Sequence, residues 1–120
     1  MAEGVGVGGS PTSGPLPGSP GLDKPIYTIS VAAEILETHP RTLMMYENIG
    51  LVVPQRTSTN RRRFSQRDIY KLQTIQSLTR QHGVNLTGVR YVLALLKALN
   101  DHGIPPPEGL KDIDVSALKI

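Results

Sequence analysis

The sequence predicts a mainly α-helical domain in which two short helices and a β-hairpin precede two longer helices. Two observations predict this fold class, and a third predicts a disordered segment in front of it. Apolar residues recur at helical spacing in four segments of residues 26–100. A stretch of β-branched, Pro and polar turn residues separates the second segment from the third. Residues 1–25 hold seven of the twelve glycines and five of the ten prolines, which predicts a disordered arm. We therefore expect an arm at 1–25, a folded domain at 26–100 and a tail at 101–120.

The first short helix is expected to begin after Ser30, a good N-cap residue, and to end near Glu37. Apolar residues at amphipathic spacing follow the cap. The inward stripe of this helix would contain Val31, Ala32, Ile35 and Leu36.

A second helix follows after roughly three residues. Thr38 or His39 is expected to cap it, and Pro40 fits its first position, where a missing N–H costs nothing. Gly50 is the expected left-handed residue that ends it. Two helices with so short a connection predict a helix-turn-helix, whose second helix can project into the major groove of DNA.

A β-hairpin and a third helix are expected next. The β-branched pair at 52–53, a Pro and a Thr-Ser-Thr-Asn turn predict a hairpin with Asn60 near its tip. Ser65, followed by Asp68, predicts the N-cap of a helix that ends at Gly83. The inward side of this helix would contain Ile69, Leu72, Ile75 and Leu78. The hairpin would form a wing beside the two short helices, which makes the predicted fold a winged helix-turn-helix.

The last helix carries more apolar residues than one face can hold. Asn85 is expected to cap it. One stripe contains Leu86, Val89, Leu93 and Leu96, and a neighbouring stripe contains Val92, Leu95 and Leu99. The second stripe is either more core or a subunit interface. We favour a dimer interface, because a domain this small cannot enclose the helix on all sides.

The tail at 101–120 begins with Gly and Pro residues that interrupt the helix. Its last part is weakly apolar, with Ile113, Val115, Leu118 and Ile120. These residues either dock on a protein surface or belong to a frayed terminus, and the sequence favours neither alternative.

Positive charge is concentrated in the middle of the chain. The net charge is only +3, but residues 41–100 contain ten Lys and Arg against Glu47 and Asp68, which amounts to +8. A field of one sign on so small a module predicts a polyanionic partner, most often nucleic acid. The alternative is a solvated basic face without a partner.

The candidate DNA contacts are donors on the second helix and arginines of the hairpin. Guanidinium groups on a wing can bridge phosphates while the neighbouring helix meets base edges. We expect Arg56 and Arg62 to be the first of these contacts. The full candidate set is Arg41, Thr42, Tyr46, Arg56, Arg61, Arg62 and Arg63.

Other function classes find no support in the sequence. Without cysteine the chain has no disulfide and no thiolate metal site. His39, His82 and His102 lack a metal-ligand spacing, and no Gly-rich phosphate loop or nucleophile motif is present. No segment approaches the roughly 20 apolar residues of a membrane helix, and none reads as a secretory signal. We expect no enzymatic activity, no cofactor, no metal and no membrane, and a cytoplasmic, nucleoid-associated location.

About residues 26–98 resemble the DNA-binding domain of MerR-type regulators. The family pattern has an initial helix, a "TLRxYE.xGL" recognition helix, a "PxRT…RRY" wing and a "S..D…L..I" helix. This chain has "TLMMYENIGL", "PQRTSTNRRRF" and "SQRDIYKLQTI" in the same order. Its "ISVAAE" and "GVNLTGV" are most similar to the heat-shock repressors called HspR, and glutamine-response regulators share the "GVN" feature.

The resemblance implies a repressor that binds inverted repeats upstream of chaperone operons, with the DnaK chaperone as co-repressor. It places phosphate and groove contacts at Arg41, Thr42, Tyr46, Arg56, Arg62 and Arg63. The chain departs from the pattern at Met44, where the family has Arg, and at Met45, where an aromatic is common. Flexible Met side chains can pack there against the domain or against thymine methyls.

The resulting hypothesis is a transcriptional repressor of chaperone genes that binds duplex DNA as a homodimer. A DnaK-type chaperone would control it through the last helix or the tail. Two rivals stay open. One is a regulator of another regulon, activating or architectural, that assembles head to tail on direct repeats. The other is a non-enzymatic adaptor whose basic surface binds an acidic protein.

Overall fold

The helices and the hairpin follow one another in the order that the sequence predicts. The protein is described here by a computed structural model, which covers residues 21–113 and 115. The elements are α1 (Ile29–Ile35), α2 (Pro40–Asn48), β2 (Gln55–Arg56), β3 (Arg62–Arg63), α3 (Gln66–Gln76), the π-helical turn η2 (Ser77–Gln81), α4 (Leu86–Asp101) and the 3-10 turn η3 (Glu108–Leu110). The predicted mainly α-helical, winged helix-turn-helix fold is confirmed. Residues 1–20 of the expected arm, and Leu118 and Ile120 of the tail, lie outside the described residues.

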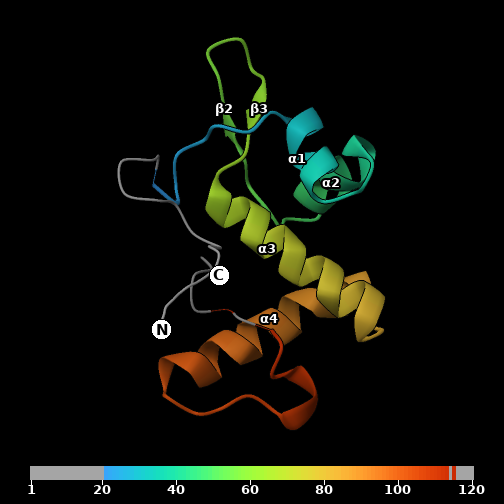
Figure 1. Ribbon diagram of the computed structural model, residues 1–120, viewed down its shortest axis with the longest axis vertical. Helices are drawn as coiled ribbons and strands as arrows, with labels where there is room; N and C mark the ends of the chain where they lie inside the picture. Colours follow the sequence, from blue (N-terminus) through green and yellow to red (C-terminus); the bar gives the residue numbers. More distant parts are fainter. Residues whose placement is uncertain (1–20, 114, 116–120) are drawn as a thin grey trace, which may run out of the picture.

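α3 lies at the centre of the fold, with α1 and α2 beside one end and α4 across the other (Figure 1). Its predicted inward side is fully buried and contains Ile69, Leu72, Ile75 and, in η2, Leu78. The predicted cap is also present. The Asp68 N–H donates to Ser65 Oγ over 3.1 Å, and the Ser65 N–H donates to Asp68 Oδ2 over 3.0 Å. Gly83, with φ of +68°, ends the helical segment as predicted.

The start of α1 differs from the prediction. Thr28, and not Ser30, is the N-cap, because its hydroxyl accepts a hydrogen bond from the Val31 N–H over 3.2 Å. Ser30 is exposed inside the first turn, and Val31 and Ile35 are 42% and 44% exposed. The buried residues are Ala32, Ala33 and Leu36. Ser and Thr are both good N-cap residues, so local preference does not decide between Thr28 and Ser30. The packing of α1 against α2 decides at which of them the helix begins.

Both ends of α2 agree with the prediction. His39 is the N-cap, and its Nδ1 accepts a hydrogen bond from the Arg41 N–H over 3.0 Å. This contact decides between Thr38 and His39. Pro40 occupies the first helical turn, and Gly50 has a left-handed φ of +82° after the last turn.

The wing is short and is anchored at its base. β2 and β3 pair antiparallel, and Asn60 at the tip has φ of +64°, as the predicted turn requires. The β-branched pair at 52–53 lies before β2 rather than in it. Tyr27 and Phe64 exchange backbone hydrogen bonds of 2.9 and 2.7 Å, and the Phe64 side chain is fully buried. The wing therefore grows out of the hydrophobic core.

α4 begins at the predicted cap and turns the first predicted stripe inward. Asn85 Oδ1 accepts a hydrogen bond from the Gly88 N–H over 2.9 Å. Val89, Leu93 and Leu96 are buried, and the partly buried Leu86 packs against them. α4 thereby closes the end of the core that is distant from the wing (Figure 1).

The tail folds back onto the domain. Ile113 and Val115 are buried in the core, so the part of the tail that is described docks rather than frays. The His82 imidazole and the Asp112 carboxylate lie 3.1 Å apart beside this contact.

The residues before α1 begin their contacts earlier than the expected boundary at residue 25. The Arg67 N–H donates to the Leu22 carbonyl over 3.0 Å, and Arg67 Nε pairs with Asp23 Oδ1 over 2.8 Å. Leu22 and Asp23, which the sequence analysis placed in the arm, therefore contact the start of α3.

We expect Thr28→Ala to lower the free energy of unfolding by about 1 kcal/mol, because the cap hydroxyl is lost. Ser30→Ala should change it by less than about 0.5 kcal/mol, since this side chain is exposed within the helix. Urea unfolding followed by circular dichroism measures both effects. Equal losses, or a larger loss for Ser30→Ala, would contradict the cap assignment.

Candidate nucleic-acid interface

One face of α2 points away from the core. The buried residues of this helix are Leu43 and Tyr46. With about 3.6 residues per turn, positions 41, 44, 45 and 48 fall on the opposite side. Arg41 and Asn48 are exposed, Met45 is 45% exposed, and Met44 is half-buried. We call this surface the α2 outer face, and it consists of Arg41, Met44, Met45 and Asn48.

Only one of the three candidate residues on α2 belongs to this outer face, and that residue is Arg41. Thr42 lies to the side and is half-buried. Tyr46 is 7% exposed and packs in the core. Asn48, which the sequence reasoning did not consider, also lies on the α2 outer face. Its position seven residues after Arg41, with Met45 four residues after Arg41, is the helical spacing that could have identified it.

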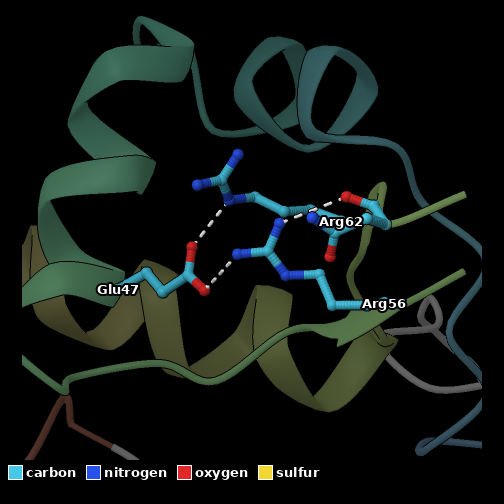
Figure 2. Close-up of polar contacts among 4 residues, drawn as sticks. Glu47, Arg56 and Arg62 are labelled. Carbon is cyan, nitrogen blue, oxygen red and sulfur yellow. Dashed lines mark hydrogen bonds and ion pairs between the residues drawn. The ribbon is translucent and has the colours of Figure 1, made fainter.

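Glu47 joins the last turn of α2 to both strands of the wing. Its Oε2 lies 2.9 Å from Arg56 Nη2, and its Oε1 lies 2.6 Å from Arg62 Nε. Figure 2 shows the two guanidinium groups converging on this one carboxylate. Glu47 thus brings the predicted pair Arg56 and Arg62 together. The sequence analysis had considered Glu47 only in the sum of charges. A usable signal was present, because Glu47 is the only acid between Arg41 and Arg67.

The ion pairs keep the Glu47 carboxylate ionised. Burial raises the pKa of Glu47, but the hydrogen bond and charge of Arg62, with the charge of Arg56, outweigh it. The pKa therefore lies below the ordinary value of 4.5. Two guanidinium groups and one carboxylate leave a net charge of +1 at this junction. Glu47 orients the two arginines while the wing stays basic.

Three wing arginines, among them Arg62, line a groove between the hairpin and the start of α1. Arg61, Arg62 and Arg63 form one wall, and Asn60 and residues 28–30 complete the lining. The groove has a volume of about 410 Å³. Arg61 is exposed, whereas Arg63 is half-buried and donates from Nη1 to the Arg62 carbonyl over 3.1 Å. The arginine triplet therefore borders a hollow in which guanidinium groups can receive an anionic group.

Arg90 of α4 holds the other side of the last turn of α2. Its Nη2 donates to the backbone carbonyl of Ile49, one of the carbonyls that a helix end leaves without a partner. A Cβ on Gly50 would lie 3.2 Å from this Nη2, so a side chain there would crowd the guanidinium. The C-terminal end of α2 is consequently held by the wing arginines through Glu47 and by α4 through Arg90.

The predicted interface residues of α4 lie together on its outward side. Leu95 is 66% exposed, and Val92 and Leu99 are half-buried. With Ile104, Pro107 and Leu110 of the tail they line an apolar groove of about 420 Å³. This surface contrasts with the basic wing and the α2 outer face.

The three histidines have separate local contacts. His39 caps α2, His82 lies against Asp112, and His102 Nδ1 lies 2.8 Å from the Ala98 carbonyl. Across the described ranges, no three His, Cys, Asp or Glu side chains gather as metal ligands. A search of the same residues finds no helix long and apolar enough to cross a membrane.

Comparisons with known proteins agree with the resemblance to MerR-type regulators. A family model described as MerR HTH family regulatory protein matches residues 27–96. The putative heat shock protein HspR of Streptomyces coelicolor is 45% identical over 73 residues, which cover 61% of this chain and 48% of that relative. The chain thus spans about half the length of this relative. The predicted similarity to HspR is confirmed.

Two further proteins are similar to the chain. The HTH-type transcriptional regulator GlnR of Bacillus anthracis is 34% identical over 95 residues, covering 79% of this chain and 72% of that relative. The second is the crystal structure of HiNmlR, a MerR family regulator lacking the sensor domain, bound to promoter DNA. Its sequence is 24% identical to this chain, and the structural match has a TM-score of 0.48 and covers 64% of this chain and 69% of HiNmlR.

We expect Glu47→Gln to lower the free energy of unfolding at neutral pH by about 1 kcal/mol, because two partly exposed ion pairs are lost. The folded-state pKa of Glu47 is depressed, so its contribution is complete above pH 4.5 and is lost as the pH falls through the folded-state pKa. Urea unfolding of both proteins between pH 7 and pH 3 measures this. Glu34→Gln, at an exposed position of α1, is the control. A difference between wild type and Glu47→Gln that stays constant with pH would contradict the role of the carboxylate.

Proposed function

The chain belongs to the MerR HTH family of regulatory proteins, and from this premise we propose that it is a sequence-specific DNA-binding repressor of chaperone genes. The observation that carries the proposal is the linked surface of α2 and the wing. Arg41 lies on the α2 outer face, and Glu47 ties the wing arginines to the same helix. The relative named HspR supports the heat-shock regulon.

In the proposed complex, α2 enters the major groove and the wing lies along the phosphate backbone. Groove contacts by a helix supply sequence selection, whereas phosphate contacts position the protein. Arg56, Arg61, Arg62 and Arg63 supply the phosphate contacts. The groove beside β3, bordered by Arg61, Arg62 and Arg63, would receive one of these phosphates. Glu47 keeps helix and wing in one fixed relation, so both meet DNA together.

The proposed repressor is a homodimer. The apolar groove at Val92, Leu95 and Leu99 supports this proposal, because exposed apolar surface of this kind marks protein interfaces. Two copies related by a two-fold axis would place two α2 helices on the half-sites of an inverted repeat. A DnaK-type chaperone acting as co-repressor at α4 or the tail completes the proposal. The protein would then act in the cytoplasm, at the chromosome, without catalytic activity of its own.

A second candidate is a MerR-type regulator of a different regulon. The match to GlnR favours it, because that match covers a larger share of both chains than the match to HspR. The two candidates share the DNA-binding surface and differ in the promoters that they select.

Selection of genomic fragments tests the proposal. Purified protein is incubated with fragmented genomic DNA at near-physiological salt, and the bound fragments are sequenced. Inverted repeats ahead of chaperone genes are the expected result. Enrichment of another promoter class would replace the heat-shock regulon by the second candidate. Failure of folded protein to enrich any sequence would overturn the proposed DNA-binding function and favour an adaptor for acidic proteins.

The double substitution Arg56→Ala with Arg62→Ala should weaken binding to all DNA sequences. If each guanidinium neutralises one phosphate, the slope of log K against log salt should fall by about two units for each DNA-bound protomer. Fluorescence anisotropy across a salt series measures the slope. Arg80→Ala, at an exposed position of η2, is the matched control and should leave it unchanged. An unaltered slope in the double variant would remove both arginines from the interface.

A further inference from the structure

We infer that Asn48 and Met45 form a sub-site that reads an adenine–thymine pair in the major groove. This inference rests on the proposed function, because it requires α2 to face the bases of duplex DNA. It goes further by naming the residues of this chain that select a base pair and the chemistry that they recognise.

Asn48 and Met45 are placed together on the side of α2 opposite the buried Leu43 and Tyr46. Asn48 is exposed, and Met45 is 45% exposed. They are three residues apart, which places them on one helical face about 4.5 Å apart along the axis. The two side chains can therefore meet the same base pair or two adjacent ones.

The side chain of Asn48 suits adenine. A carboxamide offers one acceptor and donors side by side, and adenine presents the N6 donor and the N7 acceptor in the major groove. Among the described residues, the Asn48 amide has no hydrogen-bond partner. Asn48 is also exposed, at the last residue of α2. Its hydrogen-bonding groups are thus available to a base without breaking a contact of the fold.

The side chain of Met45 suits thymine. The exposed thioether of Met45 is apolar and makes no strong hydrogen bond with water. The C5 methyl of thymine is the apolar group that the major groove offers it. Met44 on the same face is more buried than Met45, so Met45 is the methionine that extends to the groove. Glu47 does not compete for cytosine, because both of its carboxylate oxygens are engaged by arginines.

The test uses the full chain and begins with a pool of randomised duplex DNA. The sequence selected by the wild type is resynthesised with single-atom and single-group changes at each adenine–thymine pair. Replacing adenine by 7-deazaadenine removes the N7 acceptor, and replacing thymine by uracil removes only the methyl. Affinities are measured for the wild type, Asn48→Ala and Met45→Ala. Gln73→Ala and Val53→Ala, at exposed positions outside the α2 outer face, are the matched controls.

At one position the wild type and both control variants should lose about fivefold in affinity with 7-deazaadenine. At the same or the next pair they should lose roughly three- to fourfold with uracil. Asn48→Ala should bind the adenine and 7-deazaadenine duplexes equally, and Met45→Ala should bind the thymine and uracil duplexes equally. Each variant should keep its response to the other modification, which a merely unfolded protein could not do.

Two results would overturn the inference in distinguishable ways. If the wild type selects a sequence but both variants respond to the modifications as the wild type does, the sub-site is wrong and the proposed function stands. If the folded wild type selects no sequence, the proposed function fails and the sub-site fails with it.

Discussion

The Glu47 carboxylate, shared by Arg56 and Arg62, is the constraint on which the proposed DNA-binding surface depends. The hairpin has strands of only two residues each, so backbone pairing alone gives its orientation little support. The ion pairs of 2.9 and 2.6 Å connect both strands to the last turn of α2. Arg90 binds the same turn from α4 through the Ile49 carbonyl. The end of α2 is therefore the point where this helix meets both the wing and α4.

Stability and orientation come from different interactions. A fully buried Leu, Ile or Phe side chain contributes about 1.5–3 kcal/mol, whereas an exposed or partly exposed ion pair contributes about 1 kcal/mol or less. The fully buried side chains, which include Phe64, Leu72 and Ile75, therefore hold the fold together. Glu47, whose side chain is 19% exposed, instead determines how the basic groups are presented. A change at this residue can alter the surface without unfolding the domain.

α4 presents two different sides, and both matter for the proposed mechanism. Its inward stripe closes the core, and Arg90 connects it to the end of α2. Its outward stripe forms, with the folded-back tail, the apolar groove proposed as the dimer interface. A partner bound at this groove would contact α4, which also holds the end of α2 through Arg90. The proposed dimer interface and the proposed DNA-binding surface are therefore connected through one helix.

The sequence by itself determined the elements and most of their ends, because those depend on local chemistry. Pro40 fixes its own φ, whereas Gly50, Asn60 and Gly83 tolerate the left-handed conformation that helix ends and tight turns require. Ser65 with Asp68 forms a cap within one turn. The inward stripes of α3 and α4 followed from helical periodicity. The fold class and the family resemblance rest on these same local signals.

Only the tertiary structure decided which side chains are presented and which are buried. It placed the N-cap at Thr28, buried Tyr46, exposed Asn48 and docked Ile113. Glu47 and Arg62 are fifteen residues apart, and no local pattern states that they meet. The physical reason is common to these cases. Most caps and turns are satisfied by near neighbours, whereas the choice between two possible caps, the exposure of side chains and ion pairing depend on elements that come together only when the core is formed.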